Sequence, residues 1–186
     1  MRALLLRHGE SVHNANRSGE PAPHSDGDRL TERGAEQARA AGAALRERGV
    51  TRLLSSPLRR ARETAQAVGE ALDLETEEID YTRELNSGET FEQAIRRVRL
   101  LKEELESGAD GGLPLLVTHG IFARFFLLDS VLGDAFRAPM AAGIWNLGSH
   151  NCGLSVFAHG ESRDPTGAII PGWTCLTWME RPWSRP

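Results

Sequence analysis

Short apolar runs alternate along this chain with longer stretches in which apolar residues recur every three or four positions. A short apolar run suits a strand buried inside a parallel sheet, whereas the longer spacing suits a helix that packs one face against that sheet. The strands predicted in this way are residues 3–6, 52–55, 75–81 and 113–118. The alternation favours an α/β fold, a three-layer sandwich whose mostly parallel central sheet is flanked by helices.

Local signals place the starts of three helices. Thr31 suits the N-cap of a helix that follows the polar segment 17–28, which we expect to be a surface loop. Ser56 and Pro57 suit an N-cap and a first helical residue directly after the second strand. Thr90 has a glutamine three residues later, the spacing of a capping box. Two further apolar stretches, 152–158 and 173–179, predict antiparallel strands at the C-terminal edge of the sheet.

Composition removes several classes of function. The formal net charge is -4 and the sequence pI is about 5.9, so we expect no nucleic-acid partner and no binding to a membrane surface. The apolar start is too short for a secretory leader, and no run reaches membrane-spanning length, which favours the cytoplasm. We expect residues 1–186 to form a single domain. Pairing of Cys152 with Cys175 in a disulfide, and a homodimer, both stay open.

Charged and imidazole side chains follow three of the predicted strands. Arg7 and His8 come after the first strand, Arg60 follows the second in the first turn of a helix, and His119-Gly120 follows the fourth. Ligands of open α/β sheets bind beyond the carboxyl ends of the strands, so these segments are expected to converge. Guanidinium groups match phosphate geometry, a helix N-terminus offers N–H groups, and an imidazole can act as a nucleophile. The pocket therefore suits a phosphoryl group.

The same residues lie in motifs that resemble the histidine phosphatase superfamily, which includes the cofactor-dependent phosphoglycerate mutases. The resemblance extends from the N-terminus to about residue 128. Its motifs are Arg7-His8-Gly9-Glu10-Ser11 with Asn14, the block 28–38, Ser55-Ser56-Pro57-Leu58-Arg59-Arg60-Ala61-Arg62-Glu63-Thr64-Ala65, Arg83-Glu84-Leu85, and Val117-Thr118-His119-Gly120.

This resemblance implies a catalytic role for three residues. His8 would be phosphorylated, Glu84 would donate and accept protons, and His119 would assist at the phosphoryl group. The resemblance and the expected helix N-terminus together imply a phosphate-binding set of Arg7, Asn14, Arg60, His119 and Gly120. Neutral imidazole is a good nitrogen nucleophile, and fixed cations stabilise the oxygens of a transferring phosphoryl group. We expect no metal and no cofactor, because the sequence shows no ligand spacing for a metal.

Several alternatives stay open at this stage. Arg59 competes with Arg60 for the pocket, and Glu89 or Glu10 could replace Glu84 as the acid. The expected enzyme is a metal-independent phosphomonoester phosphatase, a phosphoric monoester hydrolase of the histidine acid phosphatase type. Its expected partner is a small phosphomonoester whose leaving group the sequence does not identify. The alternatives are a phosphoglycerate mutase-type phosphotransferase, a protein phosphohistidine phosphatase, and a non-catalytic phosphate-binding module.

Overall fold

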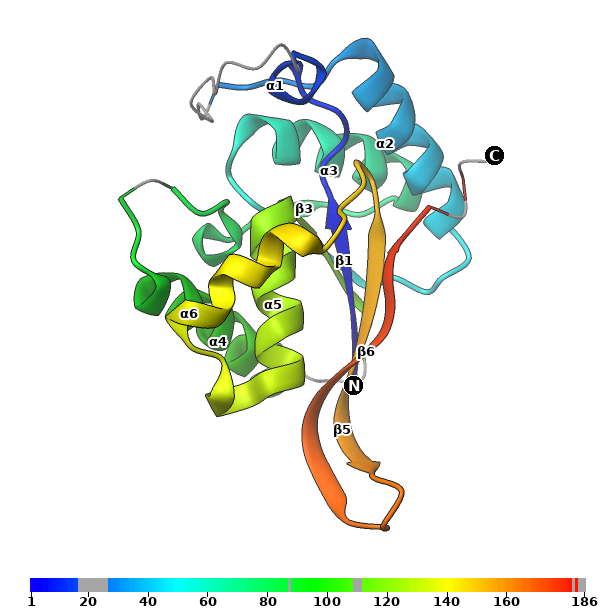
Figure 1. Ribbon diagram of the computed structural model, residues 1–186. Coiled ribbons are helices and arrows are strands. Elements are labelled where there is room, and N and C mark those ends of the chain that lie inside the picture. The colour runs from blue at the N-terminus through cyan, green and yellow to red at the C-terminus, as the bar shows by residue number, and fades with distance from the viewer. Residues whose placement is uncertain (17–26, 87, 109–111, 182, 184–186) are drawn as a thin grey trace.

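One six-stranded sheet organises the chain (Figure 1). The computed structural model describes residues 1–16, 27–86, 88–108, 112–181 and 183. The strand order is β3-β2-β4-β1-β5-β6, with parallel pairing from β3 to β1 and antiparallel pairing of β5 with β1 and β6. The strands are β1 (Arg2–Arg7), β2 (Arg52–Ser55), β3 (Thr76–Glu78), β4 (Pro114–Thr118), β5 (Leu154–Arg163) and β6 (Ile169–Glu180).

Helices cover both faces of this sheet and give the predicted three layers (Figure 1). The α-helices are α1 (Val12–Ala15), α2 (Glu32–Leu45), α3 (Arg59–Leu72), α4 (Phe91–Ser107), α5 (Gly120–Leu132) and α6 (Ala138–Ala141). Short 3-10 segments lie at Asp80–Thr82, Gly133–Ala135 and Ala142–Asn146. Among the residues described, no helix is both long enough and apolar enough to cross a bilayer.

The central strands are buried on both faces because alternate residues enter two separate cores. On β1, Leu4 and Leu6 pack in the cluster that includes Ala38 of α2 and Val68 of α3. Leu5 points to the other face, into the cluster formed with α4 and α5. This alternation explains why the central strands read as continuous apolar runs in the sequence.

The sheet brings the ends of three strands to one level. Arg7 on β1 pairs with Thr118 on β4, and Ser55 on β2 pairs with Val117 of the same strand. The chain leaves each of these strands at the same edge of the sheet. Since α3 and α5 start there, their N-termini face the same region.

Several local predictions are confirmed and others need correction. Thr31 and Thr90 cap α2 and α4, and Thr90 forms the predicted capping box with Gln93. Ser56 is not the N-cap of α3, because the helix begins at Arg59 after Leu58 in extended conformation. β3 is shorter than predicted and the C-terminal strands are longer; they form a hairpin that extends past the helical layers (Figure 1). The predicted loop 17–28 lies mostly outside the described residues.

The cysteines are unpaired in the structure. Cys152 is buried and Cys175 is partly buried, and both are free thiols. Burial raises the pKa of the Cys152 thiol to about 12. A disulfide between them is therefore not part of this fold.

A buried ion pair joins α4 to α5. Nζ of Lys102 lies 2.8 Å from Oδ2 of Asp129 and donates to Oγ of Ser130 at 2.9 Å. The same ammonium lies over the ring of Phe126, 4.6 Å from its centroid. Arg99, which is partly exposed, reaches Oδ1 of Asp129 at 3.0 Å. Both carboxylate oxygens are therefore occupied, and loss of Lys102 would leave one of them buried without its cation.

We expect Lys102→Met to destabilise the fold by about 3 kcal/mol, because it leaves Oδ2 of Asp129 buried without its cation, and Arg99 still compensates only Oδ1. Chemical denaturation of the variant measures this loss. Arg96→Met, on an exposed position of the same helix, should change stability by less than about 0.5 kcal/mol. The double variant Lys102→Met/Asp129→Leu should recover much of the loss. A Lys102→Met protein as stable as the wild type would contradict this account.

Candidate active site

Three residues that directly follow neighbouring strands form the centre of the site. The backbone N–H of His8 donates to the carbonyl of Thr118 at 2.9 Å, so the β1–β4 ladder extends to this residue. The N–H of Ser56, after β2, donates to the carbonyl of Val117 at 3.0 Å. His119, after β4, lies beside both, and its ring centroid is 5.2 Å from that of His8. The register of the sheet therefore sets the spacing of the two imidazoles.

The hydrogen bonds of His8 define its tautomer. Nδ1 lies 2.7 Å from the carbonyl oxygen of Gly9, which can only accept, so Nδ1 carries the proton. Nε2 lies 3.2 Å from Nε of Arg60, an obligatory donor. The lone pair of the neutral ring is therefore on Nε2 and faces the guanidinium. The ring is almost entirely buried, with 3% of the residue exposed.

Arg60 rather than Arg59 enters the site. Arg60 is 1% exposed and donates to His8, whereas Arg59 is exposed and pairs with Glu63 at 2.7 Å along the surface of α3. The two residues differ because a helix turns about 100° per residue, so only one of them can face the core. The carbonyl of Arg60 accepts from Thr64, whose Oγ1 also accepts from the N–H of Gly9 at 3.0 Å. Thr64 thus ties the first turns of α3 to the loop after β1.

Arg7 supplies a second guanidinium, which is partly buried. Its Nη1 donates to the carbonyl of Ser149 at 2.7 Å and to the hydroxyl of the same residue at 3.3 Å. Within the described residues its Nε is buried without a hydrogen-bond partner. Burial lowers the pKa of Arg7 to about 10, which still leaves it charged at neutral pH. Arg7 can pass close to α5 because a glycine stands at position 120; a Cβ there would lie 3.3 Å from Nε.

His119 is held by Ser56, which the sequence predicted as the N-cap of α3. Its Nε2 lies 2.7 Å from Oγ of Ser56. His119 is fully buried and is also the N-cap residue of α5, although its side chain does not cap that helix. The orientation of this imidazole therefore depends on the residue that follows β2.

Glu84 supplies the missing cap of α5 from a distant part of the chain. Its carboxylate accepts from the N–H groups of Ile121 at 3.2 Å and Phe122 at 3.0 Å, and from its own neighbour Leu85 at 3.1 Å. Burial raises the pKa of Glu84, and the three N–H donors and Arg60 offset part of that rise. An acidic group whose pKa is raised near Arg7 and Arg60 can carry a proton at the pH where these neighbours stay charged.

The other two candidate acids are differently engaged. Glu89 binds Arg97 through both of its oxygens, and Arg97 in turn donates to the carbonyl of Arg83. Glu10 accepts from the hydroxyl of Thr31 at 2.9 Å at the start of α2. Glu84 differs from both in its burial and in its position at the helix that follows His119.

Asn14 reaches the site through a residue near the C-terminal strands. Its Oδ1 accepts from Nδ2 of Asn151 at 2.9 Å, and that same nitrogen donates to the carbonyl of His8 at 3.2 Å. Arg7, Asn14, Ser149 and Asn151 line a pocket of about 370 Å³. Arg33, Arg181 and Glu10 also line this pocket, and its three guanidinium groups outnumber its one carboxylate, so its charge favours an anion.

Two glycines allow the loop after β1 to pack tightly on α2. A Cβ on Gly9 would lie 2.4 Å from the carbonyl oxygen of Gly34, and one on Gly34 would lie 2.0 Å from that of Glu10. Neither position therefore tolerates a side chain without a backbone shift. This contact fixes the chain immediately after His8.

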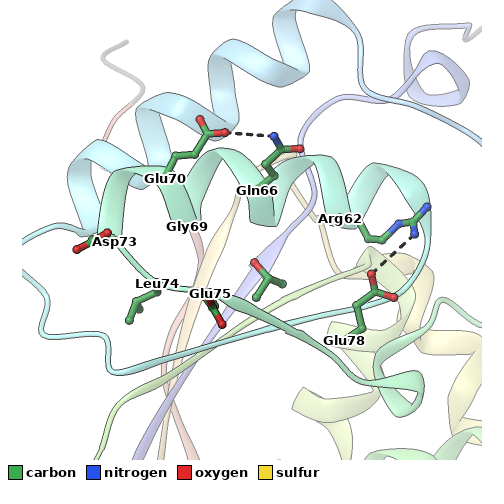
Figure 2. Close-up of a pocket in the computed structure, with 9 residues that line it drawn as sticks. Arg62, Gln66, Gly69, Glu70, Asp73, Leu74, Glu75 and Glu78 are labelled. Carbon is green, nitrogen blue, oxygen red and sulfur yellow. Dashed lines mark hydrogen bonds and ion pairs between the residues drawn. The ribbon is translucent and has the colours of Figure 1, made fainter.

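A larger hollow elsewhere has the wrong chemistry for phosphate. A pocket of about 520 Å³ lies along α3 and β3, and Figure 2 shows the residues that line it. Its lining carries four carboxylates and one guanidinium: Glu70, Asp73, Glu75, Glu78 and Arg62. Arg62 is itself 3.8 Å from Glu78. The excess of negative charge would repel a phosphate.

The structure brings most of the predicted site residues together. Arg7, His8, Arg60, Glu84, His119 and Gly120 come together, and Asn14 joins them through Asn151. Ser56, Ser149 and Asn151 were not expected to take part. The only signal for Ser56 was its place inside a motif, and Ser149 and Asn151 lie beyond the region of resemblance. Among the described residues, no three His, Cys, Asp or Glu side chains gather in a way that could hold a metal ion.

Known proteins with similar sequences agree with this picture. The sequence pattern of the histidine phosphatase superfamily (branch 1) matches residues 3–89, which include His8, Arg60 and Glu84. A protein of Escherichia coli O1:K1 described as "Probable phosphoglycerate mutase GpmB" is 29% identical over 210 aligned residues. The alignment covers 95% of this chain and 92% of that protein.

Solved structures share the fold at lower identity. A phosphoserine phosphatase from Entamoeba histolytica, in complex with phosphoserine, superposes with a TM-score of 0.76 at 17% identity, covering 98% of both chains. A mycobacterial glucosyl-3-phosphoglycerate phosphatase in complex with VO3 has a TM-score of 0.73 at 23% identity, covering 96% of this chain and 98% of that one. The matching sequence pattern over residues 3–89, the related sequences and the shared fold all bear out the resemblance of this chain to the histidine phosphatase superfamily.

Proposed function

We propose that this protein is a metal-independent phosphomonoester phosphatase that forms a phosphohistidine on Nε2 of His8. The observation that carries this proposal is the hydrogen bonding of His8: Nδ1 is bound to the carbonyl of Gly9, so the lone pair on Nε2 faces the buried guanidinium of Arg60. We further infer that residues 1–186 act as one catalytic domain, because the site uses residues from Arg7 to Asn151 around a single sheet.

The first half of the reaction transfers the phosphoryl group to His8. The Nε2 lone pair attacks phosphorus as the bond to the ester oxygen breaks in line with it, and the alcohol leaves. Arg7 and Arg60 supply fixed positive charge for the three remaining phosphoryl oxygens, and the N–H of Gly120 at the start of α5 adds a backbone donor. His119 and Asn14 add side-chain donors. Because these groups are already in place, little reorganisation is required during transfer.

Glu84 moves the proton in both halves. In its protonated form it gives a proton to the departing alkoxide, so the leaving group exits as a neutral alcohol. In the second half the resulting carboxylate takes a proton from water as the water attacks the phosphohistidine, which breaks the P–N bond and releases inorganic phosphate. The raised pKa of Glu84 supports this role, since the carboxyl group must be protonated when substrate binds.

Similar proteins support the substrate class, and they also favour a second candidate. The names of the solved structures include a phosphoserine phosphatase and a glucosyl-3-phosphoglycerate phosphatase, and both of those substrates are phosphomonoesters. The related sequences are described as probable phosphoglycerate mutases, which favours transfer of the phosphoryl group to a second hydroxyl instead of water. Incubation with 3-phosphoglycerate distinguishes the two: a phosphatase releases inorganic phosphate, whereas a mutase yields 2-phosphoglycerate.

The nucleophile can be tested by trapping the intermediate. We expect an acid-labile, base-stable phosphate on His8 after rapid quenching with a good phosphoryl donor. His8→Ala should abolish this label and lower turnover by about three orders of magnitude or more, because the aligned nucleophile is lost. His119→Ala should weaken turnover but keep a detectable label. His159→Ala is the matched control, since His159 contacts Trp173 and Glu106 on β6 and α4. A label that persists in His8→Ala would place the nucleophile elsewhere.

Glu84→Gln tests the acid and retains an oxygen that can accept from the N–H groups of α5. General acid catalysis contributes about 10²- to 10⁴-fold for poor leaving groups, so phosphorylation of His8 by an alkyl phosphate should slow by that order. The same step with p-nitrophenyl phosphate should be largely spared, and a burst should appear because only hydrolysis of the intermediate is slowed. Equal losses with both substrates in single-turnover experiments would redirect attention to Glu10 and Glu89.

The pH dependence of the same step follows from the raised pKa of Glu84. The alkyl-phosphate reaction requires protonated Glu84, so its rate should fall as pH rises through the pKa of that group. In Glu84→Gln this alkaline decline should be absent. A pH–rate profile that is identical in shape for wild type and variant would contradict the role of Glu84 as the acid.

Inhibition by an anion and removal of metals test the source of positive charge. Activity should survive exhaustive dialysis against EDTA, because guanidinium groups supply the charge in this proposal. Vanadate should inhibit more strongly than phosphate, since its five-coordinate form resembles the transferring phosphoryl group. Activity that disappears with the chelator and returns with a divalent cation would refute metal independence.

A further inference from the structure

The residues immediately before β5 make a series of contacts with the loop after β1. The carbonyl of Ser149 accepts from Arg7, and the N–H of Cys152 donates to the carbonyl of His8 at 3.2 Å. The backbone N–H of Arg7 donates to the carbonyl of Gly153 at 3.0 Å. Between these lies Asn151, whose Nδ2 reaches both the carbonyl of His8 and Oδ1 of Asn14. A segment more than 130 residues away in the chain thus lies against the proposed nucleophile.

The hydrogen-bond donors around Asn14 allow only one orientation of its side-chain amide. The backbone N–H of Ser11 lies 3.3 Å from one atom of that amide, and because an N–H only donates, this atom is the oxygen. The same oxygen accepts from Asn151 at 2.9 Å. Both hydrogen bonds use Oδ1, so Nδ2 of Asn14 is directed elsewhere, and among the described residues nothing accepts from it. Asn14 lines the 370 Å³ pocket together with Arg7.

Asn151 is oriented by the same reasoning. Its side-chain amide approaches two acceptors, the carbonyl oxygen of His8 and Oδ1 of Asn14, so the group placed between them is the NH₂. A single nitrogen therefore connects the main chain of the nucleophile to the side chain of Asn14. If Asn151 were lost, the carbonyl of His8 would still accept from the N–H of Cys152. Oδ1 of Asn14 would then accept only from the N–H of Ser11.

We propose that Asn151 is a positioning residue that holds the amide of Asn14 so that its Nδ2 donates to the phosphoryl group on His8. The inference rests on the proposed phosphatase function, because it assigns a ligand to Nδ2 of Asn14. Asn151 itself does not touch the phosphoryl group. Its contribution is to prevent rotation of the Asn14 amide, which would otherwise present an oxygen to the oxygens of an anion and repel it.

A double-mutant cycle with vanadate and inorganic phosphate as probes separates positioning from general structural support. In the wild-type background, Asn151→Ala should weaken vanadate inhibition and phosphate binding about ten-fold, comparable to the loss of one charge-assisted hydrogen bond. In the Asn14→Ala background, the same substitution should change either constant by less than about two-fold, because no amide remains to be oriented. Phosphate binding is measured by calorimetry and requires no turnover.

Two further variants protect the test against a folding defect. Asn146→Ala removes an exposed amide from the same region and should leave both constants unchanged. Asn151→Ser is a milder truncation for use if Asn151→Ala does not fold, and the thermal midpoint of each variant is recorded. In turnover assays, Asn151→Ala should lower kcat/KM relative to Asn146→Ala. The thermal midpoint of unfolding should differ little between these two variants.

The outcomes distinguish this inference from the proposed function. Equal losses from Asn151→Ala in both backgrounds would overturn the positioning role and indicate general support of the loop after β1. An Asn14→Ala protein with unchanged affinity for both anions would overturn it as well, because Asn14 would not be a ligand. A wild-type protein that bound neither vanadate nor phosphate would instead refute the phosphatase proposal itself.

Discussion

The parallel register of β1, β4 and β2 is the constraint on which the site depends. Two hydrogen bonds that continue the ladder past the strand ends, from His8 to Thr118 and from Ser56 to Val117, bring the residues after three strands to one level. A shift of one residue in any of these strands would turn the following side chain to the opposite face of the sheet. The core residues that alternate along β1 prevent such a shift, so packing far from the pocket maintains the distance between the two imidazoles.

Backbone groups, more than carboxylates, hold the charged residues of the site. Arg7 donates to a carbonyl of the segment before β5, and Glu84 accepts from three N–H groups. A carboxylate in the place of the Ser149 carbonyl would have neutralised the charge on Arg7 that a phosphate requires. Carbonyl partners orient a guanidinium and leave its full charge available to an anion. The cost is the burial of cations, which is seen in the lowered pKa of Arg7.

Sequence reasoning succeeded where a residue's environment is determined by its neighbours in the chain. The apolar runs predicted the strands, and Thr31 and Thr90 predicted the starts of two helices. The positions of the strand ends predicted that His8, Arg60 and His119 would lie close together. It failed where the partner comes from a distant segment. Serine is a typical N-cap residue, but the hydroxyl of Ser56 binds His119 and the helix begins at Arg59. Nothing local to Asn151 indicates that it lies between His8 and Asn14, because that contact exists only once β5 has paired with β1.

Glu84 has two tasks that share the same two oxygens. As the cap of α5 it is most effective when ionised, since a carboxylate is the better acceptor for the N–H groups and is attracted to the positive end of the helix. As a proton donor it must begin the reaction neutral. In the proposed cycle, loss of its proton to the alcohol therefore tightens the first turn of α5 while the phosphohistidine exists, and recovery of the proton from water loosens it again. The helix that begins beside His119 would thus be held most firmly in the half of the cycle in which water must be aligned for attack.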